Sequence, residues 1–265
     1  MFSDLWGNAK PIIGMIHLKA LPGAPRYDGN LNQIYDLALA DADALIEGGV
    51  NAVQIENQFD VPYLTGNDIG PETVACLTTA AMKIRSHFPE IPLGINVHLN
   101  GAEQAMAIAK AADAQFIRCF NLMNAYISNS GYIGAAAPSL MRYRKSIDAE
   151  NIMIFGDFQV KHGSHAITAD RTLSEKAHDI QVSGADAAIL TGMATGIAPD
   201  PMLIDDIKKN LCIPLLIGSG LNAQNLPQLW PKIDGAIVGS GFKKDGVLSA
   251  PVDLERVRQF VALIK

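Results

Sequence analysis

Polar side chains that could move protons or hold charge stand at the ends of several apolar runs in this sequence. Glu56 and Asp157 could act as general acids or bases, because partial burial raises the pKa of a carboxyl group towards the useful range. Lys161 could supply positive charge or form a Schiff base with a carbonyl, and Arg118 could grip an anionic group through paired hydrogen bonds. Together with His17, these residues form the predicted catalytic set.

Each residue of this set also has a structural interpretation, which the sequence leaves open. His17 could be a core histidine with its hydrogen bonds satisfied, and Asp157 could simply cap a loop. Glu56 and Arg118 could pair with each other as a structural ion pair. The chemical and the structural interpretations place the same side chains near the end of a strand and differ in what those side chains contact.

Asn96 and Thr191 also end apolar runs, and we predict that both face a ligand. A divalent metal could be held by side chains from four strand ends, those of His17, Glu56, His98 and Asp157. The sequence has no HxH or HExxH spacing, however, so we predict no metal site. It also has no GxSxG elbow, no Walker A loop and no nucleophilic cysteine motif.

The tripeptide Gly-Ser-Gly occurs twice near the end of the chain, each time directly after a short apolar run. The two copies consist of Gly218, Ser219 and Gly220, and of Gly239, Ser240 and Gly241. Glycine lets backbone N–H groups approach an anion closely, and the serine hydroxyls can donate hydrogen bonds as well. We therefore predict one phosphate-binding site, to which Lys243 and Lys244 would add positive charge if they turn inward. The structural alternative is that these glycines only make tight turns.

Eight short apolar runs alternate with helical patterns along the chain. The runs cover residues 11–18, 51–56, 93–98, 116–120, 152–158, 187–192, 214–220 and 235–241. Most of them lack polar alternation, as expected for parallel strands that are covered on both faces. Eight strand–helix units without a linker favour a single (β/α)8 TIM barrel domain over residues 1–265, in preference to an open doubly wound sheet.

Helix starts and loop lengths add detail to this barrel. Three predicted helix starts carry N-capping patterns, at Thr172–Glu175, at Asp200–Pro201 and, more loosely, at Asn100–Glu103. The long loops all follow strands, at residues 19–30, 57–70, 121–137 and 159–169. Barrel enzymes place their active sites at this carboxyl end of the strands, so we predict the functional site there, with loop 121–137 closing as a lid.

The composition excludes several classes of protein. The formal net charge is −6 and the pI is about 5.5, so the chain offers no general attraction to nucleic acid or to an anionic membrane. Three dispersed cysteines without a CxxC motif indicate a reducing compartment. No apolar run is long enough to span a bilayer, and the start MFSDLWGNAK does not resemble a signal peptide. We expect a cytoplasmic protein, either a monomer or a homo-oligomer.

Several motifs resemble those of one known family, in the order in which they occur along the chain. They are IHLKALPG (16–23), ENQFDVPYLT (56–65) with PET (71–73), DFQVKHG (157–163), ILTGMATG (189–196) and FKKDG (242–246). These motifs resemble the BtpA/SgcQ family, and the resemblance implies a phosphate-binding TIM barrel. Within that family, a cyanobacterial member is associated with photosystem I biogenesis, and an enterobacterial member is described as nucleosidase-like. The stretch 157–163 is more similar to the cyanobacterial type.

Three functional hypotheses follow from these observations. The first is an enzyme of the lyase, isomerase or nucleosidase type, which acts on a sugar phosphate or a nucleoside-type compound by carboxylate acid/base chemistry. The second is a non-catalytic assembly or regulatory factor that uses the barrel as a scaffold. The third is a barrel whose glycine turns hold flavin mononucleotide, whereas the first two require no cofactor.

Overall fold

The computed structural model describes residues 2–192 and 199–264, and in it eight parallel strands close into a barrel. Around the barrel the strand order is β1-β10-β9-β8-β7-β4-β3-β2. The strands are β1 Ile12–His17, β2 Ala52–Glu56, β3 Leu93–Asn96, β4 Phe116–Cys119, β7 Met153–Gln159, β8 Ala187–Leu190, β9 Leu215–Ile217 and β10 Gly235–Val238. Each predicted run overlaps one of these strands, so the predicted barrel is confirmed.

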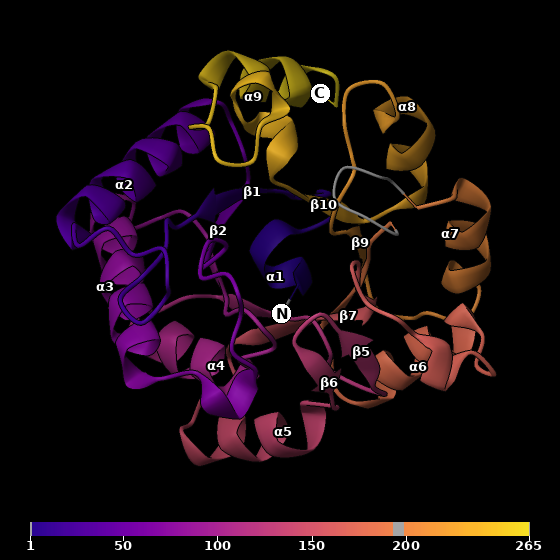
Figure 1. Cartoon of the computed structure of the whole chain (residues 1–265). Coiled ribbons are helices and arrows are strands. Elements are labelled where there is room, and N and C mark those ends of the chain that lie inside the picture. Colours follow the sequence, from indigo (N-terminus) through magenta and orange to yellow (C-terminus); the bar gives the residue numbers. More distant parts are fainter. Residues whose placement is uncertain (1, 193–198, 265) are drawn as a thin grey trace.

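Helices surround the barrel as an outer ring (Figure 1). The α-helices that follow strands are α2 Leu31–Glu47, α3 Pro71–His87, α4 Ala102–Ala111, α5 Ala137–Ser146, α6 Leu173–Val182, α7 Pro201–Lys208, α8 Leu226–Leu229 and α9 Leu254–Ala262. Single 3-10 turns occur at η1 Gly66–Asp68, η2 Ala166–Thr168, η3 Trp230–Lys232, η4 Ser240–Phe242 and η5 Lys244–Gly246. No helix within the described residues is long and apolar enough to cross a membrane.

The predicted helix starts are confirmed at two of three places. Thr172 and Glu175 form a full capping box at the start of α6, and the Asp200 side chain accepts a hydrogen bond from the N–H of Met202 in α7. The looser pattern at Asn100 is wrong, because α4 begins after Gly101 without a side-chain cap. Asn100 instead accepts a hydrogen bond from the N–H of Asn121, at 2.9 Å.

The short helix α1 (Phe2–Trp6), which the sequence analysis did not predict, closes the amino-terminal end of the barrel. Its apolar side chains pack against the interior cluster that Ile13, Met153 and Ala187 share with two phenylalanines. Those two rings, Phe116 and Phe155, stack with 4.6 Å between their centroids. In Figure 1 α1 is seen at the centre of the ring of strands, in agreement with a helix that covers one end of the barrel.

Inward-facing side chains change from apolar to polar along the strands. On β1, Ile13 and Met15 belong to the interior apolar cluster, and His17 follows at the carboxyl end. On β4, Phe116 belongs to that cluster, and Arg118 follows two residues later. Because successive side chains of a strand point to opposite faces, residues two apart share the inner face. The polar side chains therefore sit directly on top of an apolar core.

Loop 121–137 contains an antiparallel hairpin, formed by β5 (Tyr126–Ser128) and β6 (Gly131–Ile133). Ile127 and Ser164 exchange two backbone hydrogen bonds, of 3.0 and 2.7 Å, which tie the hairpin to the loop after β7. The Ser130 hydroxyl donates to the carbonyl of Tyr63 at 3.0 Å and ties it to the loop after β2. Three of the predicted long loops are thus fastened together over one end of the barrel.

Candidate functional site

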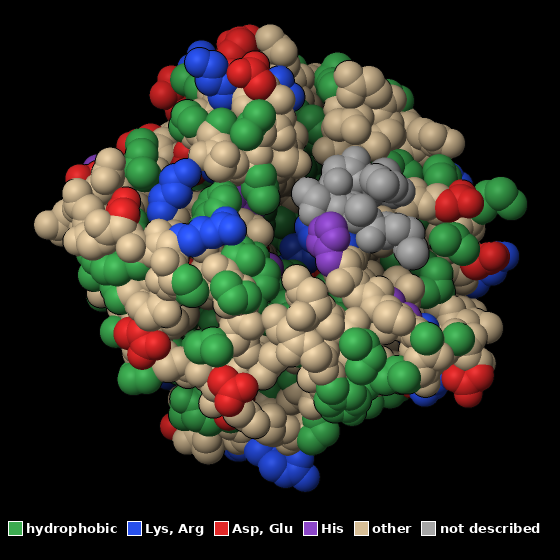
Figure 2. Space-filling view, viewed as in Figure 1, with side chains coloured by type: hydrophobic (Ala, Val, Ile, Leu, Met, Phe, Trp, Pro, Cys, Tyr) green, Lys and Arg blue, Asp and Glu red, His purple; other side chains and the backbone are tan. Residues whose placement is uncertain are grey.

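A cavity of about 300 Å³ opens at the carboxyl end of the strands, on the face that carries the long loops. Figure 2 shows a hollow near the centre of this face. The cavity wall includes all six residues of the two Gly-Ser-Gly turns. It also includes four of the five predicted catalytic residues, namely His17, Glu56, Arg118 and Lys161. The structure therefore brings the predicted phosphate-binding and catalytic residues to a single cavity.

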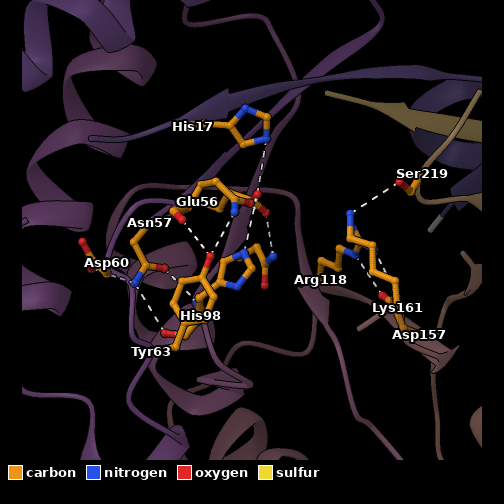
Figure 3. A network of polar contacts seen from close by, with 12 residues as sticks. His17, Glu56, Asn57, Asp60, Tyr63, His98, Arg118, Asp157, Lys161 and Ser219 are labelled. Carbon is orange, nitrogen blue, oxygen red and sulfur yellow. Dashed lines mark hydrogen bonds and ion pairs between the residues drawn. The ribbon is translucent and has the colours of Figure 1, made fainter. Parts of the chain in front are cut away.

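Glu56 lies at the centre of one side of the cavity, between two histidines. Its Oε1 is 3.4 Å from Nε2 of His17 and 3.5 Å from Nε2 of His98, while its Oε2 accepts a hydrogen bond of 2.8 Å from the Asn96 amide. The strand register explains this grouping, since Glu56 of β2 lies beside His17 of β1 and beside Asn96 of β3. In Figure 3 both imidazole rings point towards the carboxylate.

The charges of this cluster follow from its burial. Burial by itself would raise the pKa of Glu56, but His98 and His17 outweigh it and the pKa is lowered. Burial also lowers the pKa of His17, to about 4. The Nδ1 atoms of His17 and His98 are buried and have no hydrogen-bond partner among the described residues. The cluster thus presents an ionised carboxylate beside the His17 and His98 imidazoles.

Arg118 and Asp157 form a buried bidentate pair on the other side of the cavity. Nε and Nη2 of Arg118 each donate to one carboxylate oxygen of Asp157, both at 2.8 Å. Burial would lower the pKa of Arg118, but the Asp157 carboxylate outweighs it and raises that pKa. The structural alternative of a Glu56–Arg118 pair is wrong, because each of these two residues has a different partner. Asp157 has both carboxylate oxygens occupied and does not line the cavity.

Lys161 enters the cavity from the segment after β7. Its Nζ lies 3.4 Å from the Ser219 hydroxyl of the first Gly-Ser-Gly turn, as Figure 3 shows. Burial, and then the charge of Arg118, lower the pKa of Lys161. The Lys243 side chain does not turn inward: it is buried and pairs with Asp41 of α2. Lys244 is exposed and does not line the cavity either.

The glycines of the two turns serve different purposes. A Cβ atom on Gly218 would lie 2.7 Å from Nη2 of Arg118, and one on Gly239 would lie 3.0 Å from Cε1 of His17, so both positions leave room for those side chains. The N–H of Gly218 donates a hydrogen bond to the Leu190 carbonyl, at 2.8 Å. Gly220 has a φ of +83°, a conformation that favours glycine. The first glycine of each copy therefore provides space, a role that the sequence analysis did not separate from anion binding.

The second turn leads directly into a helical turn. Ser240 and Gly241 begin η4, in which the N–H of Phe242 donates to the Gly239 carbonyl at 3.0 Å. The first N–H groups of a helical turn have no partner within that turn, so those of Ser240 and Gly241 are available at the cavity wall. Arg256 also lines the cavity and is exposed, and its Nε donates to the Gly241 carbonyl at 3.3 Å.

Two residues expected to face a ligand occupy other positions. Asn96 lies behind Glu56, to which its amide donates, and it does not line the cavity. The Thr191 hydroxyl donates to the Gln159 carbonyl at 2.7 Å and is likewise absent from the wall. Both residues hold other parts of the site in place. Of the motif at 189–196, residues 193–196 lie outside the described part of the chain.

The loop after β2 contributes wall residues that we did not predict individually. The Tyr63 ring stacks on the His98 ring, with centroids 4.5 Å apart at 21°. The Tyr63 hydroxyl donates to the Gln58 carbonyl at 2.7 Å and accepts from the Gln58 amide at 2.9 Å. Asn57 fixes the backbone of His98 by accepting from its N–H at 2.8 Å. The motif ENQFDVPYLT contains Asn57, Gln58 and Tyr63. The length of this motif was the signal in the sequence that could have pointed to these residues.

The described residues contain no group of three or more His, Cys, Asp or Glu that could hold a metal ion. Three of the four residues considered for a metal, His17, Glu56 and His98, do lie together. The fourth, Asp157, is engaged with Arg118. The donor set is therefore split between the two sides of the cavity.

Comparisons with known proteins give relatives of similar length. The model of the BtpA family matches residues 8–265. An uncharacterised protein of Archaeoglobus fulgidus is 40% identical over 97% of this chain and 99% of its own. The photosystem I biogenesis protein BtpA of Synechocystis is 34% identical over 95% of this chain and 86% of its own. The solved structure of orotidine 5'-monophosphate decarboxylase from Methanocaldococcus jannaschii, complexed with inhibitor BMP, covers 97% of this chain and 99% of its own, with a TM-score of 0.61 at 12% identity. That likeness shows a shared fold alone.

Proposed function

The chain belongs to the BtpA family, as its motifs indicated, and from its site we propose that it is an enzyme that transforms a small phosphorylated metabolite by acid/base chemistry. One observation carries the proposal. Both Gly-Ser-Gly turns line the same cavity of about 300 Å³ as a buried Glu56 held between two histidines. A ligand that fills this cavity would contact an anion-binding end and a proton-transferring end together.

The groups at the anion-binding end support the proposal that the cavity holds the phosphate group of the ligand. The turns offer backbone N–H groups at Ser240 and Gly241, and the Ser219 hydroxyl stands beside the Lys161 amine. Arg118 adds a guanidinium group to the same side of the cavity. A net-acidic chain that gathers these donors at one place gains a local attraction for anions.

The proton-transferring end supports catalysis rather than binding alone. Glu56 is 4% exposed, and two of the three groups that contact its carboxylate are imidazoles, a group that can hold or exchange a proton. Burying an ionised carboxylate costs free energy, so a protein that needed only a scaffold would gain stability from an apolar residue at this position. In the proposed mechanism, Glu56 and His98 move a proton at the reacting carbon, and Arg118 balances negative charge that develops there.

Calorimetric titration with inorganic phosphate tests the proposal. Valine at Gly220 or Gly241 should weaken phosphate binding by more than about tenfold, because the added side chain displaces the turn that offers the donors. Gly29→Val is the matched control. Gly29 has a φ of +89°, close to that of Gly220, and does not line the cavity. Unchanged binding in both turn variants would contradict the proposal.

The two alternatives predict different observations. A scaffold, as the name of the Synechocystis relative suggests for that protein, should keep its partner binding when Glu56 is replaced by Gln. An enzyme should lose about two to four orders of magnitude in turnover from the same substitution. A flavin-binding barrel should take up flavin mononucleotide and become yellow, which visible absorbance detects directly.

A further inference from the structure

Lys161 is an amine on the cavity wall. Its Nζ lies 3.4 Å from the Ser219 hydroxyl. No ion pair formed between residues of 2–192 and 199–264 includes Lys161. The two carboxylates that act on it electrostatically, Asp157 and Glu56, are both engaged, the first with Arg118 and the second with histidines and an amide.

Three elements present charges to the Lys161 amine. Arg118 on β4 repels a protonated amine, while Glu56 on β2 and Asp157 on β7 attract it from positions where they already have partners. Burial is the larger influence, Arg118 is the next, and together they lower the pKa of Lys161. A larger share of Lys161 than of an ordinary lysine is therefore the neutral amine, which is the nucleophilic form.

Lys243 is a second buried lysine, but its amine is held in an ion pair. It is 2% exposed, more deeply buried than Lys161, but its Nζ pairs directly with the Asp41 carboxylate. It also points away from the cavity, whose wall does not include it. Lys161, in contrast, lines the cavity, is partly buried and belongs to no ion pair among the described residues.

We propose that Lys161 forms a Schiff base with the aldehyde or ketone carbonyl of the phosphorylated substrate. The inference rests on the proposed function, since the Gly-Ser-Gly turns must hold the phosphate beside the amine. The Lys161 nitrogen attacks the carbonyl carbon, so that a C–N bond forms as the C=O π bond breaks, and one proton moves from nitrogen to oxygen to give a carbinolamine. The second proton of the nitrogen then passes to the hydroxyl, the C–O bond breaks to release water, and the C=N bond forms, so the amine and carbonyl yield an imine and one water molecule. The Ser219 hydroxyl is placed to pass a proton between nitrogen and oxygen.

The imine defines the class of substrate and the next step. Once protonated, it withdraws electrons from the neighbouring carbon, so that a proton or a carbon fragment can leave that carbon. Figure 3 shows Lys161 and the Glu56–His98 pair on opposite sides of the site, an arrangement in which the pair can receive that proton. A short hydroxy-aldehyde or hydroxy-ketone phosphate, with its carbonyl near the phosphate ester, fits a cavity of about 300 Å³.

Reductive trapping tests this inference. The protein is incubated separately with dihydroxyacetone phosphate, glycolaldehyde phosphate and ribulose 5-phosphate, each followed by sodium borohydride, and its intact mass is measured. We expect a single covalent adduct with at least one of the three compounds, located at Lys161 by peptide mapping. Lys161→Met should abolish the adduct, and the exposed Lys244→Met should retain it. Unphosphorylated dihydroxyacetone should react more slowly.

The outcomes separate this inference from the function on which it rests. If the native protein binds inorganic phosphate by calorimetry but gives no adduct with any of the three compounds, the Schiff base is excluded and the proposed function stands. An adduct that forms equally on Lys161→Met also excludes it. If the protein binds neither phosphate nor these compounds, the proposed function fails as well.

Discussion

The two sides of the cavity differ in how their charged side chains are paired. On the β1–β3 side, both carboxylate oxygens of Glu56 contact protein groups, namely His17, His98 and the Asn96 amide. On the side formed by β4 and by β7 to β10, no ion pair among the described residues includes Lys161. In the proposed function, the first side passes on protons and the second side binds the anionic group of the ligand.

The two sides also differ in the size of the residues that they place at the same level of the barrel. β1 and β2 end in His17 and Glu56, whereas β9 and β10 are followed by Gly218 and Gly239. Gly239 leaves the space that His17 occupies, and Gly218 leaves the space that Arg118 of its own side occupies. The second turn is therefore the one that links the two sides sterically, through Gly239 and His17.

Breaking the buried Arg118–Asp157 pair should have the largest effect on stability. Asp157→Asn leaves a buried guanidinium without its counterion, and we expect a loss of about 3–5 kcal/mol in the free energy of unfolding. Denaturant unfolding measures this loss. Glu47→Gln is the control, because it breaks an exposed pair with Arg258 and should cost less than about 1 kcal/mol. Equal losses in the two variants would contradict a special role for the buried pair.

The pH dependence of stability tests the histidine side. Burial disfavours the charged form of His17 and lowers its pKa from an ordinary value of 6.5 to about 4 in the folded protein. Between these values the unfolded chain binds the proton more readily, so stability falls as the pH falls from 6.5 to 4 and His17 contributes no dependence above 6.5. The fall should reach at most about 3 kcal/mol.

His17→Gln removes the titrating group and supplies the comparison for this effect. Unfolding free energies at pH 7 and at pH 4.5 should differ less in this variant than in the native protein. In the native protein the Glu56 carboxylate remains ionised throughout this range, because His98 and His17 lower its folded pKa against the effect of burial. An identical pH dependence in the two proteins would show that His17 is not the responsible group.

Alanine at the first glycine of each turn should have a smaller effect and should reveal the space that these glycines provide for Arg118 and His17. Gly218→Ala brings a Cβ within 2.5 Å of Ile189 and 2.7 Å of Arg118, and should cost about 1–3 kcal/mol of stability. Gly239→Ala should cost less, since its nearest atom is 3.0 Å away on His17. Gly134→Ala is the control, because the atoms it approaches belong to the exposed Tyr132 side chain. A larger loss of stability in Gly239→Ala than in Gly218→Ala would contradict this role of the turns.

Much of the fold follows from the sequence because each strand is itself an apolar run. The barrel then brings the strand ends together, so His17, Glu56, Arg118 and the turns could be assigned to one mouth before their contacts were known. The helix α1 was missed because five residues carry no periodic signal. The β5–β6 hairpin was missed because its strands are three residues each and lie within a loop that was expected to be a mobile lid.

The pairing of charges could not be predicted, because it depends on which strands become neighbours and on how far side chains reach. Arg118 meets Asp157 because β4 and β7 are adjacent, although the hairpin separates them in sequence. Glu56 meets His98, which lies two residues beyond the end of β3, because the loop after β2 holds the backbone of His98 through Asn57. Nothing local in the sequence marks His98 as a partner of Glu56.

The division of the cavity into an anion-binding side and a proton-transferring side is tested most directly by one calorimetric comparison. Inorganic phosphate is titrated into the native protein, Glu56→Gln and Gly220→Val at neutral pH. Glu56→Gln should bind phosphate at least as tightly as the native protein, because it loses a negative charge and leaves the turns intact, while Gly220→Val should lose more than about tenfold in affinity. If Glu56→Gln is weakened as much as Gly220→Val, or if Gly220→Val binds normally, the division is wrong.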